Sequence, residues 1–300
     1  MTRQGRQKLG KKQVSIGILF MLPAIVMILI TLVVPVVWNL VLSFFEWNGN
    51  SEMIFRGFDN YIETFTTQST AVTLWRSVFV SLVSTVIAMG LGILYAFIIY
   101  RVGKKEGAVY RFIFFSPAMM PMTVIGLLFT FILASDSGVF NAILELIGLG
   151  NLQHAWLAEP GLVLWVIAVI QGWLRSGLIM MMIFAAVISV PNSLLESSKL
   201  EGAGYFAQVR LIIMPLIKPT IQMVLSMMLM WGFKTYDMVY AMTKGGPGEF
   251  SYTAPLKMMQ QGFTFNSYGS AAALGVILTV VVSAFILFAR KLLKGEVYEL

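Results

Sequence analysis

The chain has 300 residues, of which 58% are hydrophobic and 12% are charged, and its mean hydropathy is +0.83. Soluble domains are about half apolar and about a quarter charged, so this composition excludes a soluble domain and indicates an integral membrane protein. Cysteine is absent, which excludes disulfides and thiolate chemistry. The net charge of +7 reflects residues that flank membrane segments, so we expect no nucleic-acid partner.

Six stretches of the sequence are long and apolar enough to cross a bilayer, which takes about 20 mainly apolar residues. An all-α membrane fold with six transmembrane helices is therefore predicted. The helices are expected at residues 16–43, 74–100, 112–133, 162–190, 220–242 and 268–289. No connection between them has the length or composition of a separate domain, and no internal repeat is visible. We therefore interpret residues 1–300 as a single membrane domain.

Basic residues are concentrated in alternate connections of the predicted bundle. The N-terminal tail (1–15), the 101–111 loop, the 191–219 loop and the C-terminal tail together hold 15 of the 21 lysines and arginines. The positive-inside rule then places both termini and the 191–219 loop in the cytoplasm. The first apolar run is too long for a signal peptide and is followed by no A-x-A-like cleavage site, so it is predicted to be a retained helix.

Motifs for covalent or metal chemistry are missing from the sequence. The stretch "GRQKLGKK" at 5–12 resembles a P-loop, but Lys12 stands where the motif needs serine or threonine, and no strand precedes it. His154 is the single histidine, which argues against a His/Cys metal site. No G-x-S-x-G nucleophile motif is present. We expect a chain that is not an enzyme and that binds no metal or cofactor itself.

Three charged residues stand out well inside predicted spans: Arg175 in the fourth, and Lys234 and Asp237 in the fifth. A charge at this depth is costly and usually faces a bundle interior or an aqueous path. Lys234 and Asp237 are three apart, so on one helix they would share a face and could pair. One interpretation is a helix-stabilising ion pair, or charged side chains that snorkel to the membrane interface. The other is the polar wall of a translocation path, with neighbouring rings stacking on a sugar: Trp173, Tyr236 and Tyr240.

The 191–219 loop, "PNSLLESSKLEGAGYFAQVRLIIMPLIKP", interrupts the apolar sequence with ordered-looking polar residues. Ser193 followed by Glu196 fits a capping box, which predicts the start of a short helix. Gly202 then suits the left-handed conformation of a helix end.

The second part of the same loop predicts a turn and a second helix. Gly202-Ala203-Gly204 carries almost no side-chain bulk, so another surface could approach closely. Helical spacing then resumes, and Pro215 and Pro219 redirect the chain before the fifth span. The pattern indicates a helix–turn–helix along the membrane face, the alternative being an ordinary re-entry loop with chance small residues.

This loop resembles the EAA loop of ABC importer permeases, whose pattern is E-A-A, three residues, G-A, and later L-P-L-I-x-P. Here the matching residues are Glu196-Ser197-Ser198, then Gly202-Ala203, then Met214-Pro215-Leu216-Ile217-Lys218-Pro219. Serines replace the two alanines, and Glu201 replaces the usual aspartate. These changes keep the size or the charge.

Further segments resemble the carbohydrate branch of that family, so the resemblance covers nearly the whole chain. The branch includes the F-type subunit of maltose permeases and the A-type subunit of glycerol-3-phosphate permeases. The chain lacks the extra helices and large outer domain of that maltose subunit. The segments are "GFDNYIETF" (57–65), "RFIFFSPAMMP" (111–121), "SGVFNAIL" (137–144), "QGWLRSGLIMMMIFAAVISVP" (171–191) and "FKTYDMVYAMTKGGPG" (233–248).

The resemblance implies a type I ABC importer permease in the bacterial cytoplasmic (inner) membrane. The implied partners are a second homologous permease, two cytoplasmic ATPase subunits that bind ATP and Mg, an extracytoplasmic solute-binding protein, a sugar and membrane lipid. The "GGPG" turn at 245–248 is expected to end the fifth helix at the outer face. The implied coupling residues are Glu196, Ser197, Ser198, Glu201, Gly202 and Ala203. The candidate path residues are Gln171, Trp173, Arg175, Lys234, Tyr236, Asp237 and Tyr240.

Two other classes of function remain open at the level of sequence. An ion-coupled secondary transporter would use Asp237 as its coupling carboxylate, but such transporters typically show paired repeats. A scaffold or channel would explain the spans but not the polar loop. The sequence does not name the sugar, and the resemblance favours an oligosaccharide.

Overall fold

The computed structural model describes residues 11–292, in which helices are joined by loops and by one short pair of strands. The tail before residue 11, with most of the P-loop-like stretch, and Lys294 lie outside the described residues. An N-terminal arm is formed by α1 (Lys11–Ile28), the π-helical η1 (Leu29–Val33) and α2 (Val34–Leu42). The longest helices of the bundle are α4 (Gln68–Arg101), α8 (Val163–Ile188), α12 (Lys218–Phe233) and α15 (Tyr268–Leu292).

Shorter elements connect these helices. The first half of the chain contributes β1 (Phe45–Glu46), β2 (Ile54–Phe55), α3 (Asp59–Thr66), α5 (Lys104–Phe115), η2 (Ser116–Met119), α6 (Met122–Ile132), α7 (Val139–Leu146) and η3 (Gly150–Leu152). The second half contributes α9 (Asn192–Leu200), α10 (Tyr205–Gln208), η4 (Val209–Ile213), α11 (Met214–Leu216), α13 (Asp237–Thr243), α14 (Ala254–Met259) and η5 (Gln260–Thr264). β1 and β2 pair antiparallel, with Phe45 opposite Phe55.

Four described stretches are long and apolar enough to cross a membrane without a break: Leu19–Leu42, α4, α8 and α15. Two further candidates are helix pairs bent at a short break. Lys104–Met119 meets Met122–Ile132 at 95°, and Tyr205–Leu216 meets Lys218–Phe233 at 68°. Counting each bent pair as one span gives up to six candidates by length and composition.

Two of the six expected helices are not continuous. Instead of one helix over 112–133, α5 ends at Phe115, and Pro117 and Pro121 lie in the short 3₁₀ turn and break before α6. Proline lacks an N–H and blocks the preceding turn, which explains the sharp bend. The helix expected over 220–242 also ends early, at Phe233, and resumes at Asp237 as α13.

The centre of the bundle is the pair α4 and α8, which pack through small residues. A Cβ at Gly92 would lie 2.5 Å from Ile179, and one at Gly172 would lie 2.8 Å from the Ser84 carbonyl. Gly177 brings α8 equally close to the backbone of α5 at Phe114. Glycine at such positions lets helix backbones approach each other, which is how helices associate inside a membrane.

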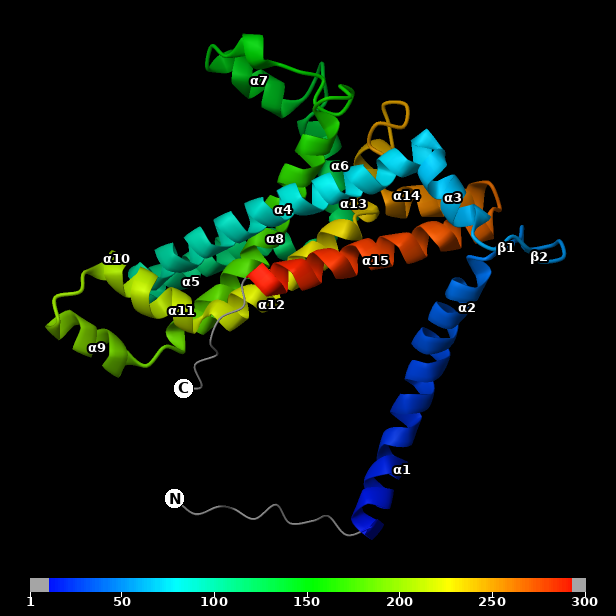
Figure 1. The fold of residues 1–300 in the computed structure, drawn as a ribbon. Helices are drawn as coiled ribbons and strands as arrows, with labels where there is room; N and C mark the ends of the chain where they lie inside the picture. Colours follow the sequence, from blue (N-terminus) through cyan, green and yellow to red (C-terminus); the bar gives the residue numbers. More distant parts are fainter. Residues whose placement is uncertain (1–10, 293–300) are drawn as a thin grey trace.

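The N-terminal arm leaves the bundle instead of packing along it (Figure 1). Its most apolar window has no buried residue, and Leu42 is the one buried residue of α2. Figure 1 also shows that α3 and the strands lie at one end of α4 and α15, and that α9 and α10 lie at the other. We call these the α3 end and the α9 end.

Candidate functional site

The 191–219 loop forms a helix, a turn and a second helix at the α9 end, as predicted. α9 ends at Leu200, and Gly202 follows with φ +85°. The Gly202 N–H donates to the Lys199 carbonyl (3.0 Å) and the Ala203 N–H donates to the Ser198 carbonyl (2.9 Å). This pair of bonds is the Schellman motif, which satisfies carbonyls that a helix end leaves free. The left-handed turn at Gly202 is therefore confirmed.

The predicted capping box at the start of α9 is wrong. The residue at the cap is Pro191, and no side chain caps the helix. The helix begins at Asn192, so Ser193 already lies inside the first turn, too far along to serve as the cap. Glu196 is left exposed on the helix surface rather than folded back to the helix start.

The expected coupling residues do not share one environment. Glu196, Ser197, Glu201 and Gly202 are exposed, Ala203 is half-buried, and Ser198 is buried. A Cβ at Gly202 would meet no atom within 4 Å, so the turn presents open backbone.

Sequence reasoning missed two apolar side chains on the same loop. Leu200 is 92% exposed and Phe206 is 82% exposed, one on each side of the turn at Gly202. The sequence could have indicated them, because they are large apolar residues in an otherwise polar loop. Exposed apolar side chains mark interaction surfaces.

The loop continues directly into α12, with which its second helix forms one of the two bent span candidates. α10, η4 and α11 form one helical stretch that ends at Leu216, and α12 begins at Lys218 with Pro219 in its first turn. Pro215 lies at the start of α11. The prediction that Pro215 and Pro219 redirect the chain is confirmed by the 68° bend.

The second region of interest is the break between α12 and α13, at residues 234–236. Lys234 is the C-cap of α12, and Asp237 is the first residue of α13. Both side chains are exposed, and they form no ion pair with each other in the described part of the chain. The expected shared helix face does not exist, because the helix is interrupted between them. Each charge instead lies at the helix end whose dipole favours it.

A buried polar chain holds the break in place. The Thr235 hydroxyl donates to the Gln171 side-chain carbonyl (2.8 Å), and the Thr253 hydroxyl donates to the Thr235 carbonyl (2.9 Å). Gln171 has no exposed surface, and its Nε2 has no hydrogen-bond partner among the described residues. Gln171 is therefore buried on α8 against the break and does not lie on an exposed surface.

Arg175 and Trp173 lie on α8 among aromatic rings. The Arg175 guanidinium sits 4.6 Å from the centroid of the Trp231 ring, and its Nη2 is 3.6 Å from the Met122 sulfur. Its Nε is buried and has no hydrogen-bond partner within residues 11–292. Trp173 packs edge-on against Phe129, with ring centroids 5.9 Å apart. A cation over an aromatic face is stabilised even where water is scarce.

Tyr236 and Tyr240 stack on each other beside the break. Their ring centroids are 5.5 Å apart and the rings are within 14° of parallel. Tyr240 is exposed, as are Lys234 and Asp237, so charged and aromatic side chains are accessible close to the break in the sequence. The structure thus brings four of the seven expected path residues together at the break and places Arg175 and Trp173 on the neighbouring α8.

The turn at 245–248 ends α13, as predicted. Lys244 adopts the left-handed conformation directly after the helix. The loop that follows is fixed by Glu249, whose carbonyl accepts from Arg76 and whose carboxylate pairs with the buried Lys257 (3.2 Å). Burial raises the pKa of Tyr252 in this loop, and the nearby Glu249 carboxylate raises it further.

Among the described residues, no group of three or more His, Cys, Asp or Glu side chains could hold a metal ion. His154 instead contacts one carboxylate, that of Glu159, at 3.1 Å.

Comparisons with known proteins agree with this geometry. The probable ABC transporter permease protein YurN of Bacillus subtilis (strain 168) is 30% identical over 278 residues, which are 92% of this chain and 95% of that protein. The trehalose/maltose transport system permease protein MalF of Thermococcus litoralis is 25% identical over 283 residues, which are 93% of each chain.

Solved structures show the same fold. In the crystal structure of a bacterial ABC transporter involved in the import of the acidic polysaccharide alginate, one chain matches with a TM-score of 0.81 at 22% identity. The match covers 94% of this chain and 96% of that chain. The family model described as binding-protein-dependent transport system inner membrane component matches residues 88–295. The chain therefore belongs to this family of ABC transporter permeases, as a multi-pass membrane subunit that is not itself an enzyme.

Proposed function

We propose that this chain forms half of the sugar pathway of an ATP-driven importer, together with a second, homologous permease. The observation that carries the proposal is the exposed helix–turn–helix at the α9 end, which continues directly into the fifth span. The relatives support a carbohydrate as substrate. One transports trehalose and maltose by name, and another is a sulfoquinovosyl glycerol permease of Agrobacterium fabrum.

The same proposal orients the chain in the bacterial inner membrane. Six spans with both termini in the cytoplasm put the α9 end inside and the α3 end outside. The excess of basic residues in the tails and in the two loops at the α9 end supports this orientation. A solute-binding protein then delivers substrate at the α3 end. The solved alginate transporter is in complex with a pentasaccharide-bound periplasmic protein, which supports such a partner.

In this mechanism α9 docks on one of two cytoplasmic ATPase subunits, and those subunits bind ATP and Mg. The ATPase contacts exposed polar side chains of the loop and the open backbone of its turn: Glu196, Ser197, Glu201, Gly202 and Ala203. The exposed apolar side chains of Leu200 and Phe206 pack against the same ATPase. Closure of the ATPase pair displaces α9. The displacement passes along α10 and α11 to α12 and opens the pathway alternately to each side.

We assign the pathway surface to the break in the fifth span. Stacked Tyr236 and Tyr240 offer flat apolar faces to the C–H face of a sugar, while Lys234 and Asp237 bond its hydroxyl groups. Arg175 and Trp173 extend this surface along α8, and buried Gln171 supports it from behind through Thr235. Relatives named for trehalose/maltose transport and diacetylchitobiose uptake favour an oligosaccharide as the proposed substrate.

Co-purification of this chain with its ATPase, comparing the native protein with Gly202→Arg, tests the docking step. The arginine should abolish the association because it fills the open turn and strains a backbone at φ +85°. Gly148→Arg is the matched control, since Gly148 also has positive φ (+78°) and no atom within 4 Å, and lies beyond α7. Gly202→Asn should retain the ATPase, because asparagine tolerates the left-handed conformation.

The native preparation can then be screened for oligosaccharides that, with the binding protein, stimulate ATP hydrolysis. Absence of any ATPase from the native preparation would contradict the proposal. Uptake lost in Asp237→Asn without any ATPase requirement would instead favour an ion-coupled transporter.

A further inference from the structure

A buried polar contact joins α9 to α10 underneath the turn at Gly202. The Gln208 side-chain amide donates to the Ser198 hydroxyl (2.9 Å) and to the Leu195 carbonyl (2.9 Å). The Ser198 hydroxyl in turn donates to the Leu195 carbonyl (2.8 Å). Ser198 and Gln208 are each only 7% exposed, so water does not compete for these bonds.

Because this contact is buried, it fixes the position of α9 relative to α10. A buried amide that loses its partners is left unsatisfied, which is costly, so the amide holds the two helices at the separation where both bonds form. The two residues are ten apart and lie on either side of a turn that has no side-chain bulk. Without the contact, the glycines at 202 and 204 would leave the angle between α9 and α10 weakly defined.

A second contact anchors α10 to the bundle. The Arg101 guanidinium at the end of α4 lies 4.7 Å from the centroid of the Tyr205 ring at the start of α10. A cation over a tyrosine face is attractive in this geometry. α10 is thus attached to α4 on one side and to α9 on the other, and it continues into α12 through the proline bend.

We propose that Gln208, acting through Ser198, is a positioning residue that makes α9 and α10 one rigid lever. The inference rests on the proposed function, because a lever matters only if an ATPase moves α9. Ser198, which the EAA resemblance counts among the coupling residues, then acts from inside the loop and touches no partner. Ser198, which replaces the usual alanine, supplies the hydroxyl that accepts the hydrogen bond from the Gln208 amide.

Spin-label distances can test the lever directly, since the chain has no native cysteine. Cysteines replace exposed Asn192 on α9 and exposed Leu211 on η4, and the full chain is purified with the subunits it holds. Gln208→Met, which keeps the length but removes the amide, and Ser198→Ala should both broaden the distance distribution. Ser193→Ala, an exposed serine on the same helix, is the matched control and should leave the width unchanged.

The functional readout is the number of ATP molecules hydrolysed per sugar imported. Gln208→Met should raise this ratio about threefold or more while ATPase association persists, and Ser198→Ala should raise it less, because one amide bond to Leu195 remains. Rescue of the Ser198→Ala ratio by Ser198→Thr would exclude a mere packing defect.

An unchanged distance distribution in Gln208→Met would contradict the proposal that Gln208 holds α9 and α10 as one rigid lever. A broadened distribution with an unchanged ratio would overturn its role in coupling. A native chain that holds no ATPase would reject the proposed function itself, and the distance distribution would still decide whether the lock between α9 and α10 exists.

Discussion

The N-terminal arm is more apolar in sequence than α4 and α8, yet α4 and α8 are packed tightly and the arm is not. α4 and α8 touch through glycines whose Cβ would collide with the facing helix, whereas no residue in the most apolar window of the arm is buried. Hydrophobicity therefore predicts membrane insertion but not packing. Small residues at defined positions decide which helices associate.

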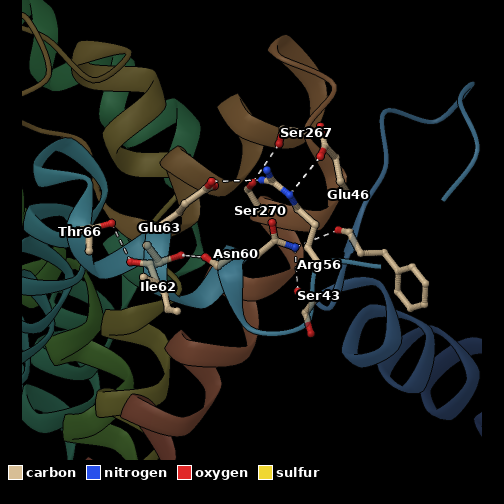
Figure 2. A network of polar contacts seen from close by, with 11 residues as sticks. Ser43, Glu46, Arg56, Asn60, Ile62, Glu63, Thr66, Ser267 and Ser270 are labelled. Atoms are coloured by element: carbon tan, nitrogen blue, oxygen red, sulfur yellow. Dashed lines mark hydrogen bonds and ion pairs between the residues drawn. The ribbon is translucent and has the colours of Figure 1, made fainter. Parts of the chain in front are cut away.

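A polar joint connects the arm to α3 at its α2 end (Figure 2), next to the ring contacts of Phe44 with Phe58 and Tyr61. The buried Asn60 side chain donates to the carbonyls of Ser43 and Phe45, each at 2.9 Å. Arg56 bridges the carboxylates of Glu46 and Glu63, each at 3.2 Å. The core should accordingly be sensitive to side-chain volume, and the arm to hydrogen bonding at its joint.

The largest effect is expected from Gly177→Leu in α8. A Cβ at this position would lie 2.1 Å from the Phe114 carbonyl, and backbone cannot move aside as a side chain can. We expect a loss of about 4 kcal/mol or more in the free energy of unfolding, and therefore little folded protein. Gly90→Leu is the control, because a Cβ there meets nothing within 4 Å. Thermal unfolding in detergent measures both, and equal effects would contradict the packing of α8 on α5.

A smaller loss should follow from removing one core side chain. Ile179 is fully buried against Gly92. Ile179→Ala should lower the free energy of unfolding by about 2–5 kcal/mol, because it leaves a cavity. Leu32 on the arm is 60% exposed, so Leu32→Ala should change the free energy of unfolding by less than about 0.5 kcal/mol. Denaturant titration of the two variants measures the contrast directly, and a costly Leu32→Ala would show that the arm packs on the bundle.

Asn60→Leu should loosen the arm and spare the core. The carbonyls of Ser43 and Phe45 lose their donor, which should destabilise the joint by about 2 kcal/mol and leave the stability of the core unchanged. Spin labels on the arm and on α15 should report a wider range of distances, while the unfolding of α4 and α8 stays unchanged. Thr66→Val, on the same helix, breaks only a local bond to the Ile62 carbonyl and should leave the distances as they are.

The smallest effect is expected from Arg56→Gln. Its two carboxylate partners are largely exposed, so the pair of contacts should contribute less than about 1 kcal/mol. The difference from the native chain should also disappear at high salt, where exposed charges are screened. Unfolding at low and high ionic strength measures this, and a loss of more than about 2 kcal/mol would mean that Arg56 holds the joint together with Asn60.

The sequence predicted the segments that depend on local chemistry. The apolar runs located the candidate spans, Gly202 located the end of α9, and Pro215 with Pro219 located the bend before α12. Each of these follows from residues that are near neighbours in the chain.

The features that the sequence did not predict depend on distant contacts. The break at 234–236 contains neither proline nor glycine, and Thr235 is held there by Gln171 and Thr253 from other helices. The lock between Ser198 and Gln208 spans ten residues and follows no helical period. The capping box failed because the helix begins two residues earlier than the motif requires, with Pro191 and not Ser193 at the cap.

The unpacked arm has a consequence for the order in which the importer is built. In water, a helix with this much exposed apolar surface would aggregate, but lipid tails are as apolar as leucine, so the arm gains little by leaving them. The core can therefore fold in the bilayer before any other subunit arrives. In the proposed importer, this chain would then meet its partner permease by lateral encounter in the bilayer, with its own core already formed.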